Sequence, residues 1–317
     1  MNYDFAPMEG LTDSVYRRLH HKHFQGIDRY YMPCLSPTMH QVLTRKEDRE
    51  LPTADSVGFN AVPQILTKIP EDFLWAAEKC QQRGYSEVNL NIGCPSGTVV
   101  AKGKGAGMLA DPQGLDRFLD AVFTSTPLPV SVKTRVGMQH HDEFVRLMDI
   151  FNRYPIKELI IHPRVRKDFY STPIREDAFR LAAEISVNPL CYNGDICSLA
   201  DAEAIRQQYP RLVSVMIGRG LIGDPGMLTS GGTTADKLEA FHNDLMEEYI
   251  IVFGSARNAM FRLKENWRYL ICRFEGGEKL FKRLRKTTDI AEYRSITAEI
   301  FHSLPLSHAL KPDWLND

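Results

Sequence analysis

The chain has 317 residues, of which 43% are hydrophobic and 25% charged, the composition of a folded globular protein. Its 39 Lys and Arg residues balance 40 Asp and Glu residues, which excludes a protein that coats nucleic acid or membrane through its overall charge. The uncharged segment 88–101 is too short and too polar for a transmembrane helix. This length is compatible with one large barrel or with two domains.

The cysteines and the N-terminus indicate the compartment. Six cysteines are scattered without CxxC pairs, so we expect reduced thiols rather than a zinc site or a disulfide framework. The N-terminal residues lack a basic region and a small-residue cleavage site, which favours a cytoplasmic location. We expect no membrane association, no obligate protein partner and a monomer. Histidines 20, 21, 23, 140 and 141 are expected on helix surfaces, and no metal site is predicted.

Short β-rich segments alternate with helix-like segments up to about residue 230. The predicted strands cover residues 3–8, 28–33, 61–66, 87–91, 130–134, 158–162, 189–193 and 213–217. The intervening segments include helices predicted over 71–80 and 112–123, both with a proline at the start, and over 198–208. This alternation predicts an α/β fold, namely a (β/α)8 TIM barrel over residues 1–234.

After the Gly/Thr/Ser-rich segment 229–234 the strand signal ends, which predicts a small all-helical domain over residues 235–317. Residues 257–294 carry 11 basic and five acidic side chains. Five aromatic residues lie among these charges: Phe261, Trp267, Tyr269, Phe274 and Phe281. Two interpretations stay open. Either the aromatic rings stack on bases beside a phosphate-binding face, or they fill a helical core beneath a solvated basic face.

Polar residues stand at or just after the C-terminal ends of the predicted strands, where a TIM barrel carries its active site. In chain order they are Gln64, Asn91, Cys94, Lys133, Arg135, His162, Arg164, Asn193, Asp195 and Arg219. Glycines at 194, 218 and 220 let backbone amides approach an anion, which predicts a phosphate site at the last two strands. Cys94 lies in a loop between Gly93 and Pro95, whereas Cys80, Cys191 and Cys272 are expected to be packing residues.

Several of these residues form an ordered set of motifs: Ala6-Pro7-Met8-Glu9-Gly10, Asn91-Ile92-Gly93-Cys94-Pro95, Lys133 with Arg135, His162-Pro163-Arg164, Asn193-Gly194-Asp195 and Gly218-Arg219-Gly220. In this order and spacing the chain resembles the tRNA-dihydrouridine synthases over about residues 6–220. The resemblance implies FMN at the barrel mouth, NADPH as its reductant, and reduction of the C5–C6 double bond of selected uridines in tRNA.

The resemblance also implies residue roles. Pro7, Met8 and Glu9 would line the flavin, Gln64 and Lys133 would bond its ring edge, and His162 would lie near the flavin or the base. Asn193, Gly194 and Asp195, with Gly218 and Arg219, would hold its phosphate end, and Asn91 and Arg164 would lie near the uridine. An ordinary cysteine thiol, with a pKa of about 8.5, is protonated at neutral pH, and Cys94 is therefore the expected proton donor.

Two departures from the family pattern leave the target uridine open. Asn89 stands where many members carry an acid, and the segment after Arg164 lacks a glycine often found there. A buried flavin requires the uridine to be swung out of the tRNA, and the basic segment 257–294 would bind tRNA phosphates. Two alternatives remain: an FMN barrel acting on a free pyrimidine, and an RNA-binding protein without catalysis.

Overall fold

The computed structural model describes residues 1–307, so residues 308–317 of the predicted helical domain lie outside the described residues. The chain forms two compact units. The first contains residues 1–7, 28–194 and 202–216, and the second contains residues 8–27, 195–201 and those from 217 onward. Within residues 1–307 no helix is long and apolar enough to cross a membrane.

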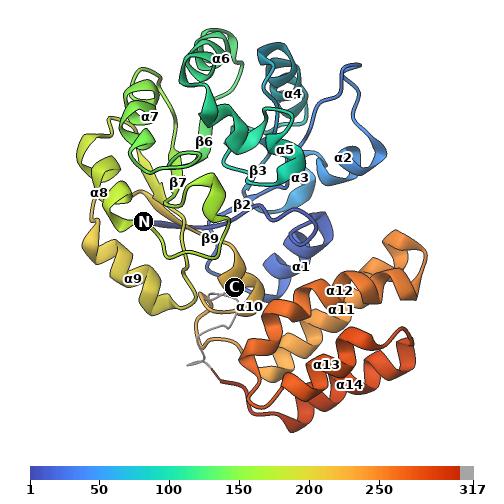
Figure 1. The fold of residues 1–317 in the computed structure, drawn as a ribbon. Helices are drawn as coiled ribbons and strands as arrows, with labels where there is room; N and C mark the ends of the chain where they lie inside the picture. Colours follow the sequence, from blue (N-terminus) through green and yellow to red (C-terminus); the bar gives the residue numbers. More distant parts are fainter. Residues whose placement is uncertain (308–317) are drawn as a thin grey trace. The chain divides into compact units, whose positions relative to one another are not determined.

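The first unit is built on a nine-stranded sheet, in which β1, β2 and β3 pair in parallel and β4 to β9 pair in parallel. Its order is β3-β2-β1-β9-β8-β7-β6-β5-β4 (Figure 1). The strands are β1 (Asn2–Phe5), β2 (Arg29–Tyr31), β3 (Ala61–Val62), β4 (Gln64–Ile65), β5 (Val88–Ile92), β6 (Val130–Arg135), β7 (Leu159–His162), β8 (Leu190–Tyr192) and β9 (Ser214–Ile217). All eight predicted strand segments are therefore confirmed.

Nine strands correspond to the eight predicted strand segments because Pro63 interrupts one of these segments. Proline has no N–H to donate, so the segment 61–65 is divided into β3 and β4. The residues before Pro63 pair with β2, whereas the Pro63 carbonyl accepts a hydrogen bond from Asn89 N at 2.8 Å and β4 pairs with β5. The two ends of the sheet thus meet within one segment, and the strands form the predicted barrel.

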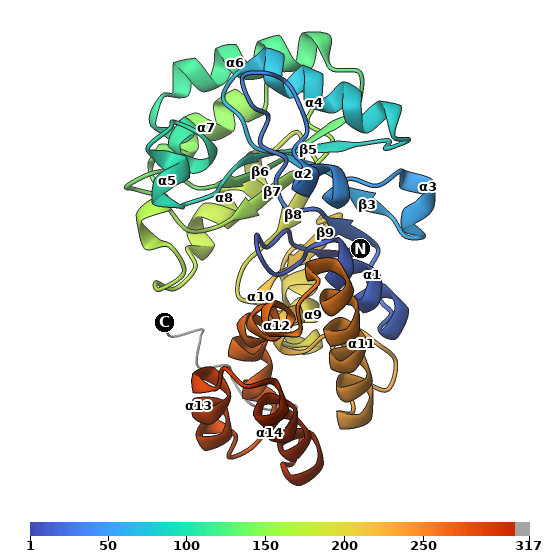
Figure 2. The ribbon, with the colours of Figure 1, turned by 90° about the vertical axis from the view of Figure 1, so that its right-hand side faces the viewer.

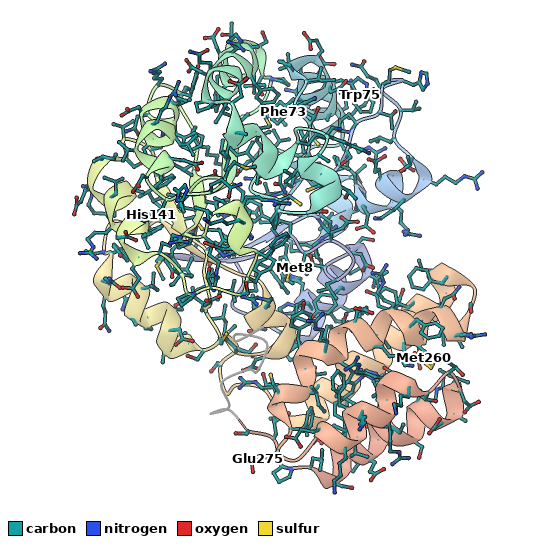
Figure 3. The ribbon with its side chains drawn as sticks, viewed as in Figure 1. Met8, Phe73, Trp75, His141, Met260 and Glu275 are labelled. Carbon is teal, nitrogen blue, oxygen red and sulfur yellow. The ribbon has the colours of Figure 1, made fainter. Side chains whose placement is uncertain are left out.

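Helices cover the outside of these strands. Figure 1 shows α4 (Pro70–Gln82), α6 (Pro112–Ser125), α7 (Glu143–Phe151) and α8 (Glu176–Ile185) following one another around the sheet. Helices α4 and α6 both begin at their proline, as predicted, and Phe73 of α4 meets Phe118 of α6 edge to face at 6.2 Å. Figure 3 labels Phe73, which is fully buried there.

Shorter elements complete the connections. They are α2 (Arg45–Glu50), α3 (Ala54–Val57), α5 (Gly97–Val100), η1 (Gly105–Ala110), η2 (Arg166–Asp168) and α9 (Leu199–Gln208). Helix α9 corresponds to the predicted helix over 198–208. Of the histidines expected on surfaces, His141 is partly exposed and lies 3.2 Å from Asp177 (Figure 3).

A buried ion network lies inside the barrel of the first unit. Arg29 donates to both carboxylate oxygens of Asp4, at 2.8 and 2.6 Å, and pairs with Glu158 at 2.5 Å. Asp4, Glu158 and Cys191 together have the composition of a metal site, but the Arg29 guanidinium already bonds both carboxylates. We therefore assign this cluster to stability rather than to metal binding.

Replacement of Arg29 by methionine should destabilise the fold by about 3–5 kcal/mol, because Asp4 and Glu158 would remain buried without a counter-charge. Thermal or urea unfolding measures this loss. Arg206→Met is the control, since Arg206 pairs with Glu203 on an exposed helix surface and the change should cost at most about 1 kcal/mol. Equal stability of the two variants would contradict the role given to the network.

The second unit is helical. It contains α1 (Ser14–His23), α10 (Arg219–Gly223), α11 (Ala235–Phe253), α12 (Ala256–Leu270), η3 (Ile271–Arg273), α13 (Glu278–Lys286) and α14 (Ile290–Ser303). Helix α1 packs against α11, and Figure 2 shows α11 beside α12 and α13 beside α14. His20 of α1 is fully buried with its Nε2 2.9 Å from the Pro225 carbonyl, so the expectation of a surface position was wrong for this histidine.

The core of the second unit shows which of the two interpretations of segment 257–294 holds for two of its five aromatic residues. Trp267 and Phe274 are at most 2% exposed and pack with Phe301, so they are core residues. Met260, labelled in Figure 3, is buried on the same helix as Trp267. Phe261, in contrast, is 40% exposed, with Lys264 5.1 Å from its ring centre.

Candidate functional site

A continuous chain of polar side chains runs up the interior of the barrel in the first unit. Ser131 donates to Glu87 at 2.7 Å and accepts from Asn89 at 3.0 Å, and Gln64 donates to Asn89 Oδ1 at 2.7 Å. Asn91 donates to Gln64 Oε1 at 2.7 Å. Residues 87, 89 and 91 share one face of the strand because side chains alternate, and this period brings the predicted residues Gln64 and Asn91 into direct contact.

Asn91 also positions the loop that carries Cys94. Its Oδ1 accepts hydrogen bonds from the backbone amides of Gly93, at 3.1 Å, and of Cys94, at 2.9 Å. A Cβ at Gly93 would come within 3.2 Å of the Thr134 backbone, so glycine allows the loop to lie against β6. The Cys94 carbonyl accepts from Ala106 at 3.0 Å, which fixes the loop on its other side.

Replacement of Asn91 by alanine should remove the acceptor of two backbone amides and the donor to Gln64. We expect a loss of about 1–3 kcal/mol of unfolding free energy, because these groups lie in a largely buried site. Chemical denaturation measures the effect. Asn152→Ala is the control, since Asn152 makes its hydrogen bonds at an exposed position. An unchanged denaturation midpoint for Asn91→Ala would contradict this positioning role.

Cys34 belongs to the same cluster, although no role was expected for it from the sequence. Its Sγ donates to Gln64 Oε1 at 2.9 Å and accepts from Asn91 Nδ2 at 3.1 Å. Its position directly after the second predicted strand, 28–33, is the signal in the sequence that points to the site. Asn89 was noted only as a departure from the family pattern, yet it links Gln64 to Ser131.

Lys133 of β6 supplies a cation at the same end of the strands. Its Nζ donates to Asn193 Oδ1 at 2.7 Å, and the Asn193 amide donates to the Met216 carbonyl at 2.8 Å. Burial lowers the pKa of Lys133 to about 8, and the charge of Arg135 acts in the same direction. The two predicted ligands Lys133 and Asn193 are therefore directly bonded to each other.

His162, the last residue of β7, and Arg164, two residues beyond it, are neighbours in space as well as in sequence. Arg164 is 1% exposed, with Nη1 3.1 Å from His162 Nε2 and Nε donating to the Thr172 carbonyl at 2.6 Å. The His162 ring stacks on Tyr170 with ring centres 5.6 Å apart. Arg135 lies 5.1 Å from the Tyr170 ring centre and donates to the Gly93 carbonyl at 3.0 Å. Tyr170 was not among the predicted site residues.

The remaining predicted residues divide between the units. Pro7 and Gly194 belong to the first unit, whereas Met8, Glu9, Asp195, Gly218 and Arg219 belong to the second. In the second unit Arg219 donates to Asp195 at 2.9 Å. The backbone of Asp195 has a positive φ of 44°. A Cβ at Gly220 would collide with the Ile196 carbonyl, so glycine is required there. The Met8 carbonyl accepts from the amides of Leu11 and Thr12 at 3.0 Å.

Comparison with known proteins gives the fold and the family. The structure of a morphinone reductase variant in complex with tetrahydroNAD matches with a TM-score of 0.51 and 11% identity, over 71% of this chain and 85% of that one. Histamine dehydrogenase from Rhizobium sp. 4-9 matches with a TM-score of 0.51 and 10% identity, over 71% of this chain and 45% of that one. At these identities the likeness shows the fold alone.

Relatives in sequence are more specific. The tRNA-dihydrouridine synthase B of Pasteurella multocida is 29% identical over 69% of this chain, and the match spans 65% of the length of that relative. A probable tRNA-dihydrouridine synthase of Staphylococcus aureus is 28% identical over 93% of this chain and 91% of that protein. The family described as Dihydrouridine synthase (Dus) matches residues 4–303.

By class, this chain is a flavin-dependent oxidoreductase, and its fold is a parallel barrel. It belongs to the dihydrouridine synthase family. The resemblance inferred from the ordered motifs is thereby confirmed.

Proposed function

We propose that this protein reduces the C5–C6 double bond of uridines in tRNA, with FMN as bound cofactor and NADPH as reductant. The observation that carries the proposal is the Asn91 side chain, which bonds the Cys94 amide on one side and Gln64 on the other. A thiol whose loop is held in this way at the end of a strand is placed to supply a proton, and membership of the dihydrouridine synthase family supports a reductive reaction at this site.

The residues present fit a flavin. Lys133 offers a cation for the ring edge, where reduction adds negative charge, and Gln64 and Asn193 offer amide groups. We propose that Gln64 and Lys133 bond the edge of the ring, that Pro7, Met8 and Glu9 line it, and that His162 lies near the ring or the base. For the phosphate end we propose Asn193, Gly194, Asp195, Gly218 and Arg219. When bound, reduced FMN supplies the hydride.

Side chains of the protein then supply the proton and orient the base. Addition of a hydride at uracil C6 leaves an electron pair at C5 that must accept a proton. We propose that the Cys94 S–H bond breaks, that its proton goes to C5, and that water later reprotonates the thiolate. Asn91 holds the loop of Cys94 in place, and Arg164 with Asn91 would orient the uracil.

We further propose that residues 235–317 form a tRNA-binding domain. The exposed basic residues of α13, among them Lys279, Lys282, Arg285 and Lys286, support a phosphate-binding face. All six cysteines are free thiols, which supports a reducing compartment, the cytoplasm.

The proposal is tested by following the oxidation of NADPH by purified, flavin-loaded protein without oxygen. Addition of tRNA that lacks dihydrouridine should restart NADPH oxidation after the bound flavin has been reduced. Stimulation by a free pyrimidine instead of tRNA would contradict the proposed substrate and favour the second enzymatic alternative. Absence of bound flavin, with tRNA binding intact, would favour an RNA-binding protein without catalysis.

A further inference from the structure

The loop that follows β7 presents two aromatic side chains to solvent. Phe169 and Tyr170 are each 43% exposed, while the residues around them in the loop are polar or charged. The guanidinium of Arg166 lies 5.1 Å from the Phe169 ring centre, and the Tyr170 ring stacks on His162. Tyr170 therefore connects the predicted site residue His162 with the surface of the first unit, where Phe169 is also exposed.

This loop is held rigidly by buried polar contacts. Asp168 is 5% exposed and accepts from Arg175 Nη2 at 3.0 Å, from Arg175 Nε at 3.2 Å and from the Val165 amide at 3.2 Å. The backbone amides of Arg166 and Lys167 donate to the carbonyls of Gly137 and Met138 at 2.8 and 3.2 Å. The aromatic side chains are thus presented on a fixed backbone.

Phe169 has a strained backbone conformation. Its φ is 48° with ψ at −99°, a region that a residue with a Cβ rarely adopts. Such a conformation persists only where surrounding contacts impose it, and it concentrates at functional sites. Stability alone would favour a glycine at this position and a buried phenylalanine elsewhere, so the exposed ring indicates a binding role.

We propose that Phe169 and Tyr170 form a stacking platform for unpaired nucleobases of the tRNA next to the target uridine. This inference rests on the proposed function and adds a second RNA contact, outside the helical domain. The segment 164–175 has four basic residues and one acidic residue, and that acid, Asp168, is buried against Arg175. Rings beside basic side chains such as Arg166 and Lys167 suit a nucleic acid rather than an apolar protein surface.

The test compares tRNA affinity among variants of the full chain. Phe169→Gly and Phe169→Leu should each weaken tRNA binding about tenfold, because both remove the ring. Phe169→Gly should also keep or raise the melting temperature, since glycine accepts the positive φ. Reduction of the bound flavin by NADPH should remain unchanged in both variants. Val187→Ala, an exposed apolar residue before β8, is the control and should bind tRNA like the unmodified chain.

Salt dependence separates stacking from charge. The slope of log Kd against log salt concentration should be the same in Phe169→Gly as in the unmodified chain. In Lys167→Ala the slope should be smaller by about one, because one phosphate contact is lost. Unchanged tRNA affinity of both Phe169 variants, in a protein that forms dihydrouridine, would overturn the platform and leave the proposed function standing. A protein that binds tRNA through Phe169 but forms no dihydrouridine would uphold the platform and overturn the proposed function. A weakened affinity that accompanies a lower melting temperature would also overturn the platform.

Discussion

Replacement of Cys94 by alanine should slow the formation of dihydrouridine by about 10²- to 10⁴-fold, the usual contribution of a positioned general acid. The alanine variant retains the backbone amide that Asn91 holds, so the loop should keep its conformation. Reduction of the bound flavin by NADPH requires no proton from this side chain and should proceed at the normal rate. Single-turnover measurements of the two half-reactions check both statements.

The matched control is Cys272→Ala. Cys272 is another partly exposed thiol that donates a hydrogen bond, to the Tyr269 carbonyl, but it lies in the helical unit. This variant should form dihydrouridine at nearly the normal rate. If Cys94→Ala and Cys272→Ala were equally active, the assignment of Cys94 as the proton donor would be wrong.

Replacement of Lys133 by methionine should slow flavin reduction about 10²- to 10³-fold, because the variant loses the cation that stabilises negative charge on the reduced ring. The pH dependence gives a second, independent readout. Since burial lowers the pKa of Lys133 to about 8, the ammonium is charged below that pH and is lost above it. The rate of flavin reduction should therefore fall on the alkaline side, with an inflection near pH 8.

Lys133→Arg is the informative companion variant. A guanidinium stays protonated throughout the accessible range, so the alkaline inflection should disappear even where the absolute rate is lower. Stopped-flow absorbance of the flavin measures these rates. An inflection near pH 8 that persists in Lys133→Arg would show that another group controls the reaction.

Much of the barrel is predictable from the sequence because parallel strands are short apolar segments between recognisable helices. The polar residues inside the barrel are also predictable as strand-end residues, and within the first unit Asn91 does bond Gln64 and Lys133 does bond Asn193. Cys34 shows the limit of this reasoning. Its contact with Gln64 depends on how two distant strands are placed together, and no local pattern encodes that placement.

The helical unit shows a second limit. Tyr249 of α11 donates to Asp13 at 2.9 Å, and Arg18 pairs with Glu248, across more than 200 residues of sequence. Amphipathic periodicity predicts that a helix has a buried face but not which helix covers it. The same ambiguity applied to Trp267 and Phe274, whose core positions became evident only from their packing with Phe301.

The proposed reaction is tested most directly by mass-spectrometric mapping of tRNA after incubation with the purified protein, FMN and NADPH. The tRNA should come from cells that lack dihydrouridine. We expect a mass increase equal to two hydrogen atoms at defined uridines, strongly reduced with Cys94→Ala. A protein with bound flavin that NADPH reduces, but with no mass change on any uridine, would contradict the proposed reaction.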